Sequence, residues 1–162
     1  MKTAVIAVPR LEPHRPPPGP AIVAKICADQ GHTVTVYDLN IKMFNEFAKH
    51  GYDFFGLDEF FNRNTTITKE QKTLIDDFTN QWANRIADEK YDYLMIGIFS
   101  TVCHWYGRYL IEKLRALNCQ SKIIIGGMGV GTFDLITPEK SFGHTMLADQ
   151  LIDAFIVGEA ES

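Results

Sequence analysis

The segment at residues 126–132 (GGMGVGT) has the composition of a ligand-binding loop. Its spacing does not match the G-x-G-x-x-G of dinucleotide-binding loops, and the Lys-Ser or Lys-Thr of a phosphate-binding P-loop does not follow it. Glycines do, however, let a large or flat ligand approach the backbone closely. The segment therefore predicts either such a contact surface or a simple turn at the end of a strand.

A second segment, residues 8–21 (VPRLEPHRPPPGPA), is rich in proline and also carries Arg10, His14 and Arg15. In nucleotide-binding α/β proteins, the loop after the first strand presents backbone N–H groups to a phosphate. Proline has no N–H, so this loop would be a poor phosphate site. It predicts a stiff wall beside a ligand of another kind.

Small polar side chains follow the central apolar run at residues 93–99. Ser100 and Thr101 could each hydrogen-bond a ligand or cap the next helix. Cys103 and His104 are adjacent, which does not by itself make a catalytic pair, and we expect His104 at a helix end or on the surface. The sequence contains no G-x-S-x-G motif and no acidic pair after its first apolar run. We therefore expect neither a hydrolase nor a receiver domain, and we assign no catalytic residue.

Five short apolar runs, separated by helical patterns, must position these residues. The runs lie at residues 3–8, 33–38, 93–99, 122–127 and 154–158. The first, third and fourth are continuously apolar, which is typical of parallel strands covered on both faces. Helical patterns occupy residues 18–31, 68–90, 103–118 and 137–152, the second beginning with a Thr68 and Gln71 capping box and the last with Thr137 as N-cap. This alternation predicts an α/β fold, a Rossmann-like doubly wound sheet of about five parallel strands flanked by helices.

The length of 162 residues predicts a single domain over residues 1–162. Residues 40–66 do not fit the alternation, because six phenylalanines are spread there among polar residues without a clear period. We expect an excursion that packs its own aromatic side chains over the sheet edge, or alternatively a lid or partner-facing patch.

Charge and composition exclude several classes of partner. The net charge is -4 and no basic run occurs, so we expect no nucleic acid partner. No apolar stretch approaches the roughly 20 residues of a membrane-spanning helix, and the N-terminus predicts a strand, not a signal peptide. Three widely separated cysteines are typical of reduced thiols, so we expect a cytoplasmic location.

Taken together, four ordered segments resemble the N-terminal cobalamin-binding domain of cobalamin-dependent radical S-adenosylmethionine enzymes. They are residues 16–40 (PPPGPAIVAKICADQGHTVTVYDLN), 91–100 (YDYLMIGIFS), 123–132 (IIIGGMGVGT) and 153–162 (DAFIVGEAES). The resemblance covers nearly the whole chain. It implies that the corrin ring of cobalamin lies across the carboxyl ends of the strands. The nucleotide tail, detached from cobalt, would descend beside the serine strand and the paired glycines.

The resemblance also implies which residues surround the cofactor. The first loop would approach the lower face of the ring, the serine segment would contact the tail, and the glycine segment would let the tail pass close to the backbone. The closing Gly-Glu would lie at the edge of the site. The implied cofactor-binding residues are Arg10, His14, Arg15, Ser100, Thr101, Val102, Gly126, Gly127, Met128, Gly129, Gly158 and Glu159.

The sequence departs from the cobalamin-binding pattern in two respects. Methionine-synthase-type binders carry a D-x-H-x-x-G motif whose histidine ligates cobalt. Aligning their glycine with Gly19 puts Pro16 in the place of that histidine, and His14 lies two residues away. A ligand role for His14 stays open, but we expect a base-off cofactor and no metal ligand from this chain. The C-x-x-x-C-x-x-C of the radical module is also absent, so a 4Fe–4S cluster and S-adenosylmethionine are expected only in a missing or partner domain, in cis or in trans.

The expected function is therefore that of a cobalamin-binding module, not catalytic alone, of a radical S-adenosylmethionine methyltransferase-type enzyme. Two alternatives stay open. The chain could be a cofactor-free α/β interaction or scaffold domain whose working surface is the phenylalanine-rich segment. It could also be a small flavin- or nucleotide-binding protein.

Overall fold

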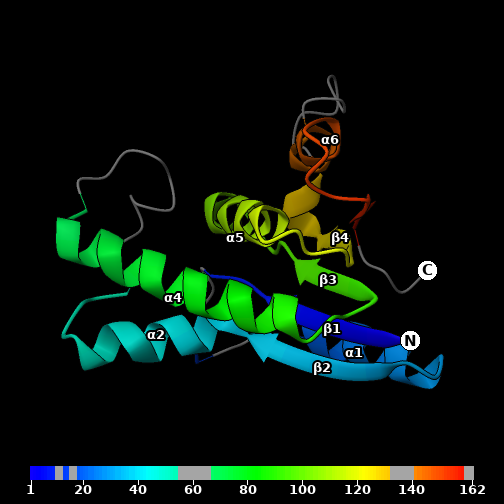
Figure 1. Ribbon diagram of the computed structural model, residues 1–162, viewed down its shortest axis with the longest axis horizontal. Coiled ribbons are helices and arrows are strands. Elements are labelled where there is room, and N and C mark those ends of the chain that lie inside the picture. The colour runs from blue at the N-terminus through cyan, green and yellow to red at the C-terminus, as the bar shows by residue number, and fades with distance from the viewer. Residues whose placement is uncertain (10–12, 15–17, 55–66, 132–140, 159–162) are drawn as a thin grey trace.

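Strands and helices alternate along the chain in the computed structural model, which describes residues 1–9, 13–14, 18–54, 67–131 and 141–158 (Figure 1). Each strand end lies within two residues of its predicted position, so the predicted strands are confirmed. The strands are β1 (Lys2–Ala7), β2 (Thr33–Asp38), β3 (Tyr93–Gly97), β4 (Lys122–Gly127) and β5 (Ala154–Val157). The helices are α1 (Gly19–Asp29), α2 (Leu39–Lys49), α4 (Lys69–Asp88), α5 (His104–Ala116) and α6 (Phe142–Ala148), with single 3₁₀ turns η2 (Thr101–Cys103) and η3 (Met128–Val130).

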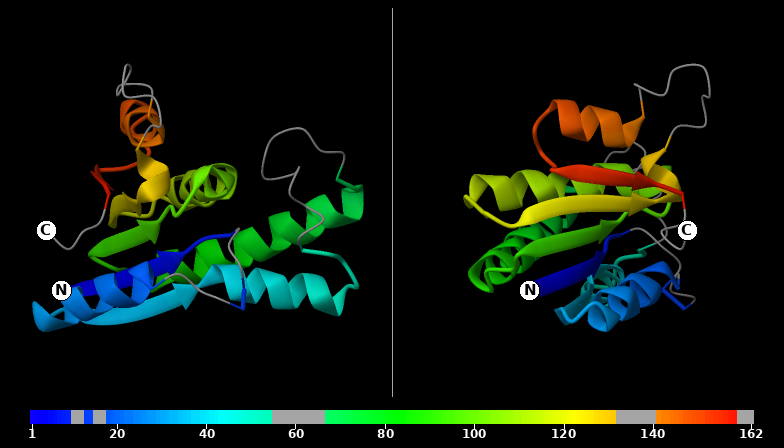
Figure 2. Two further views of the ribbon diagram at one scale, coloured as in Figure 1. Left: turned by 180° about the vertical axis from the view of Figure 1, so that it is seen from behind. Right: turned by 90° about the vertical axis from the view of Figure 1, so that its right-hand side faces the viewer.

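The five strands form one parallel sheet in the order β2-β1-β3-β4-β5. From β1 the chain moves outward to β2 on one side, and then from β3 through β4 to β5 on the other. Helix α1 lies on the opposite face of the sheet from α4 and α5 (Figure 2). The chain is therefore a doubly wound, Rossmann-like α/β domain, as the sequence predicts.

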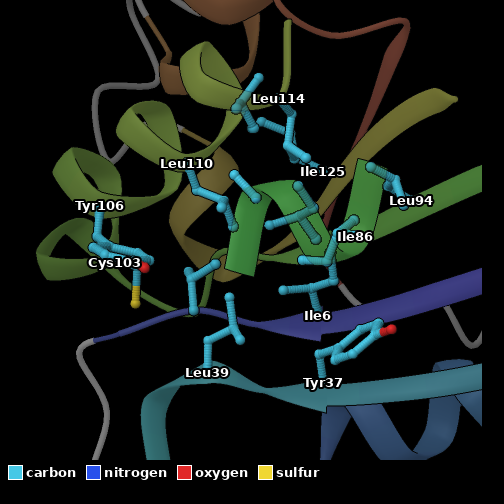
Figure 3. Packing of buried hydrophobic residues seen from close by; sticks show 14 of the residues in the cluster. Ile6, Tyr37, Leu39, Ile86, Leu94, Cys103, Tyr106, Leu110, Leu114 and Ile125 are labelled. Carbon is cyan, nitrogen blue, oxygen red and sulfur yellow. The ribbon is translucent and has the colours of Figure 1, made fainter. Parts of the chain in front are cut away.

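The hydrophobic core lies between the sheet and the helices α4 and α5 (Figure 3). Ile6, Ile96 and Ile125 stand at matching register on three adjacent strands, and all three are buried. Leu110 and Leu114 of α5 are fully buried against the same cluster. Burial of each such side chain contributes about 1.5–3 kcal/mol, so this face holds the sheet and helices together.

The opposite face of the sheet is less completely covered. Every residue of β1 from Thr3 to Ala7 is buried, as expected for a strand covered on both faces. In β3 and β4, however, residues are alternately buried and half-buried. Met95 and Ile124 are among the half-buried ones, and Ile156 of β5 is 44 % exposed. The prediction of two covered faces thus holds for β1, whereas β3 and β4 leave one face open to the space described below.

The phenylalanine-rich segment begins with a regular helix, which the sequence analysis did not predict. Residues 39–49 form α2, capped by the carboxylate of Asp38, which accepts a hydrogen bond from the Ile41 N–H at 2.9 Å. Phe47 is fully buried and contacts the rings of Phe54 and Tyr52 edge to face. The expected mutual packing of aromatic side chains is therefore confirmed for the described part of the segment. Residues 55–66 lie outside the described residues.

Helix α6 begins later than the sequence suggests. Its N-cap is Ser141, whose hydroxyl accepts a hydrogen bond from the His144 N–H at 3.3 Å. The predicted cap, Thr137, lies outside the described residues. Gly143 permits close packing, since a Cβ there would stand 2.6 Å from the Phe155 ring of β5. The helix therefore packs on β5 and holds that edge strand from one side.

Asp153 anchors the entry to β5. Its carboxylate accepts hydrogen bonds from the Ile123 N–H at 2.8 Å and from the Arg115 guanidinium at 2.9 Å. Partial burial opposes ionisation, but these two interactions outweigh it and hold the pKa of Asp153 below its usual value. Because the folded-state pKa is depressed, the stabilisation is present above the unfolded-state pKa of about 4 and is lost as pH falls below it.

We predict that Asp153→Asn lowers the free energy of unfolding at pH 7 by about 1 kcal/mol, a modest value because the carboxylate is partly exposed. Between pH 5 and pH 3, the free energy of unfolding should fall by about 1 kcal/mol less in the variant than in the wild type. Urea denaturation across this pH range measures both effects. Asp77→Asn, at an exposed position of α4, is the matched control. An unchanged pH profile in Asp153→Asn would contradict the assignment.

Helix α4 is 20 residues long and starts with the predicted capping box. The Thr68 hydroxyl accepts from the Gln71 N–H at 3.2 Å, and the Gln71 side chain accepts from the Thr68 N–H at 2.9 Å. Among the helices that the structure describes, neither this one nor any other combines the length and apolar character needed to cross a membrane.

Thr68→Ala is expected to lower the free energy of unfolding by about 1 kcal/mol, because the Gln71 N–H at the helix start loses its hydrogen-bond acceptor. Thr73→Ala, on the exposed surface of the same helix, should change it by less than about 0.5 kcal/mol. Chemical denaturation of both variants tests the cap. Equal effects of the two substitutions would mean that the box contributes nothing specific.

Candidate functional site

The strand order places a crevice at the carboxyl ends of β1 and β3. These two strands are neighbours, but the chain leaves them in opposite directions, toward β2 and toward β4. In open parallel sheets such a switch point leaves room for a ligand, because the two connections diverge. The predicted site segments follow β1, β3 and β4, so the sheet brings them to one edge.

An apolar cavity of about 250 Å³ opens here, on the face of the sheet that α1 covers in part. Its floor comes from β1, β3, β4 and β5, and its wall from the first turns of α1. The described residues that line it are Val5, Ala7, Pro18, Gly19, Pro20, Ile22, Val23, Met95, Ile96, Gly97, Ile98, Phe99, Ile124, Ile125, Gly126, Gly127, Met128, Ile156 and Gly158. None of these side chains carries a charge, a hydroxyl or an amide, so the cavity suits an apolar group.

The register of the strands makes part of the floor flat. Ala7 pairs with Gly97, Gly97 with Gly126, and Gly126 with Ile156, so these four residues form one row across the sheet. Two of them have no side chain and a third has only a methyl group. A planar group could therefore lie against the backbone of β4 at Gly126, beside the Pro20 side chain, whose Cγ would stand 3.9 Å from a Cβ on Gly97.

Gly97 and Gly126 are not required by the fold itself. A Cβ built on Gly97 would meet its nearest atoms, in Ile6 and Pro20, at 3.7 and 3.9 Å. A Cβ on Gly126 would lie 3.8 Å from Ile156. These are ordinary van der Waals distances, and neither glycine has a positive φ. A larger side chain at either position would instead occupy the cavity.

The two neighbouring glycines of the predicted site serve the fold. Gly127 has φ +111°, and a Cβ there would stand 2.8 Å from the carbonyl oxygen of Ile98. A Cβ on Gly129 would stand 2.8 Å from both Ile98 and Ser100 backbone atoms. The Gly129 N–H donates to that same Ile98 oxygen at 2.9 Å. These glycines let the β4 segment pass close to the end of β3.

The prolines before α1 form an apolar wall opposite the glycine floor. Pro18 is the N-cap of α1 and offers no side-chain cap, while Pro20 lies in its first turn. The side chain of Pro20 lies over Gly97, since a Cβ built on that glycine would stand 3.9 Å from the Pro20 Cγ. Because proline lacks an N–H, this helix start presents fewer donors than usual. Among the described residues, Pro18 and Pro20 therefore form an apolar wall of the cavity.

The rim of the cavity is apolar and open. Phe99 and Met128 follow β3 and β4, and they are 48 % and 61 % exposed. Ile156 of β5 is also exposed. These three residues, which we call the apolar rim, line the cavity near the carboxyl ends of the strands.

Ser100, Thr101 and Val102 lie just past this rim and not in the cavity lining. Ser100 stands at the N-cap position of η2, but its hydroxyl makes no capping hydrogen bond. Thr101 is exposed, and Val102 packs partly on the core. Capping by Ser100, one of the roles that the sequence left open, is therefore not observed.

His104 ties the two site segments together. It is the first residue of α5, as the expectation of a helix end requires. Its Nε2 forms a 2.6 Å hydrogen bond with the carbonyl oxygen of Gly129, and its ring stacks on Phe142 with centroids 4.1 Å apart. The histidine thus has a structural role, holding η3 against the start of α5.

The remaining predicted residues are only partly within the described structure. His14 is exposed, with its ring edge-on to Phe44 of α2 at a centroid distance of 5.7 Å. Gly158 lines the cavity with φ +86°. Arg10, Arg15 and Glu159 lie outside the described residues. Within the described part of the chain, no three His, Cys, Asp or Glu side chains gather as a metal-binding group.

The cavity contains residues that the sequence analysis missed. Gly97 lies inside the third apolar run, where its register with Gly126 could not be seen. A glycine within a strand often marks close approach of a ligand or another backbone, and that signal was present. Ala7 and Ile156 carry no such signal, because they are ordinary strand residues.

Comparison of the chain with protein-family models, with curated proteins and with solved structures finds no match. The fold and the site define a doubly wound α/β domain with an apolar cavity at its switch point. The geometry of that cavity is the main structural indication of function.

Substitution by alanine should affect stability differently at Gly126, which borders the cavity, and at Gly127, which the fold requires. Gly126→Ala should leave the free energy of unfolding within about 0.5 kcal/mol of the wild type, or raise it slightly by restricting the unfolded chain. Gly127→Ala should lower it by about 2 kcal/mol or more, because of its φ and its contact with Ile98. Thermal and urea unfolding of the two variants measure the difference. Equal destabilisation would show that Gly126 is also needed by the fold.

Proposed function

We propose that this chain is a cobalamin-binding module whose cavity takes the detached nucleotide tail of the cofactor. The observation that carries the proposal is the apolar cavity above the Ala7, Gly97 and Gly126 row. This cavity lies at the carboxyl ends of the strands, where the resemblance in sequence leads us to expect the cofactor.

The residues of the cavity fit the tail of cobalamin in shape and polarity. The tail ends in a planar, methylated aromatic base, and the floor is flat and apolar. The fold would tolerate a Cβ at Gly97 and at Gly126, but both residues lack a side chain, and this leaves room in the cavity. Burying such a base removes apolar surface from water and so favours binding.

Separate parts of the chain would hold the separate parts of the cofactor. Gly97, Gly126 and Met95 would contact the tail base, while Phe99 and Met128 of the apolar rim would support the underside of the ring. Ser100, whose hydroxyl is not used in capping, lies close enough in sequence to Phe99 to meet the polar linker of the tail. When bound, cobalamin supplies the methyl-carrying cobalt, and the protein supplies orientation and shielding.

The proposed module acts together with a radical S-adenosylmethionine domain, in the same chain or in another. None of the side chains that line the cavity can exchange a proton near neutral pH. The chain's own residues therefore bind and orient, and they exclude water from the tail. The methyl-transfer reaction would take place on the exposed side of the ring with the partner domain.

The test is retention of hydroxocobalamin by the purified protein after gel filtration, followed by the visible spectrum and a binding titration. We predict that the wild type retains cobalamin with the spectrum of the base-off form. Gly126→Leu should fill the cavity and raise the dissociation constant at least about tenfold, without loss of fold by circular dichroism. Gly97→Val provides a second, independent obstruction of the same cavity.

Val36→Phe is the matched control. Val36 lies on the same face of the sheet, on β2, is 51 % exposed, and is outside the cavity lining. The Val36→Phe variant should bind cobalamin with the same dissociation constant as the wild type. No retention by the wild type, or equal retention by Gly126→Leu, would overturn the proposal. A yellow protein with bound flavin would instead support the flavin alternative.

A further inference from the structure

The cavity offers a planar ligand no polar partner among the side chains that the structure describes. Val5, Met95 and Ile124 stand in one row on three adjacent strands, and Ile22 and Val23 face them from α1. A ligand base that needs hydrogen bonds would lose those with water and gain none from these side chains.

The backbone groups next to the cavity are also largely occupied. The Gly126 carbonyl accepts from the Ile98 N–H at 2.7 Å, and the Ile98 carbonyl accepts from the Gly129 N–H at 2.9 Å. On the α1 side, the Ile22 N–H donates to the Pro18 carbonyl at 3.1 Å. Pro20 has no N–H at all. These backbone groups already have partners within the fold, so they are not available to a polar ring.

We propose that this cavity selects among cobalamin-like cofactors by the polarity of the tail base, preferring dimethylbenzimidazole to adenine. The inference rests on the proposed function and deepens it. Adenine carries an exocyclic amine and several ring nitrogens that water satisfies in solution. Transfer of such a group into an apolar site without partners costs about tenfold to a hundredfold in affinity, which corresponds to about 1.4–2.8 kcal/mol.

Met95 is the residue that sets this preference most directly. Its side chain is half-buried, lines the cavity, and sits in the centre of the row between Val5 and Ile124. Glutamine has nearly the same length as methionine and adds one acceptor and two donors. Met95→Gln should therefore supply a partner for adenine at the same place, whereas Met95→Leu should keep the site apolar.

The experiment compares dissociation constants of the purified full chain for three probes by equilibrium dialysis and visible absorbance. The probes are cobalamin, the same corrinoid with adenine in place of dimethylbenzimidazole, and cobinamide, which has no tail base. We expect the wild type to bind cobalamin at least about tenfold more tightly than the adenine form. Cobinamide should bind more weakly than cobalamin, since it leaves the cavity without an apolar occupant.

The variants test the cause of the preference. Met95→Gln should reduce the preference for cobalamin at least about threefold, and Met95→Leu should retain it, with circular dichroism confirming that both fold. Equal affinity of the wild type for cobalamin and the adenine form would overturn the inference but leave the proposed function intact. Cobinamide bound as tightly as cobalamin would show that the tail is not in the cavity. No binding of any probe would overturn the proposed function itself.

Discussion

The register of the parallel sheet is the constraint on which the candidate site depends. Hydrogen bonding fixes Ala7 beside Gly97 and Gly97 beside Gly126, and it fixes Ile6, Ile96 and Ile125 one step earlier on the opposite face. Because side chains alternate between faces, a slip of one residue would send the isoleucines into the cavity and the glycines into the core. The dense core under α4 and α5 therefore also keeps the cavity floor bare.

The glycines near the end of β4 differ in what they do. Gly127 and Gly129 allow the backbone of η3 to touch the end of β3, and His104 holds the carbonyl of Gly129 from the side of α5. Gly126 and Gly97, in contrast, leave room for a Cβ, whose nearest neighbours would stand at ordinary van der Waals distances. Gly127 and Gly129 are therefore needed for the packing of η3 on β3, whereas Gly97 and Gly126 leave the cavity free of side chains. Within one glycine-rich segment, Gly127 and Gly129 therefore serve the fold, whereas Gly126 borders the cavity.

The described lining of the cavity suits an apolar group. It is apolar throughout, its wall contains prolines, and Phe99 and Met128 are exposed beside it. Such a surface stabilises a flat apolar group by removing it from water. The assignment to cobalamin stays a proposal that unites this geometry with the resemblance in sequence.

The sequence by itself determined the fold class, because apolar runs of strand length alternate with helical patterns and admit few other arrangements. It also placed Gly126, Gly127, Met128 and Gly158 at one edge of the sheet, since the carboxyl ends of parallel strands share one edge, and all four line the cavity. The sequence pattern did not predict α2. Phe44 and Phe47 lie in this helix and Phe54 lies after it, so the phenylalanines of the whole segment show no single helical period. Only the tertiary structure decided which glycines face the cavity and that Gly97 joins them. Which glycines face the cavity depends on the register between strands and on distances to residues far away in the sequence. The local sequence pattern does not determine either of these.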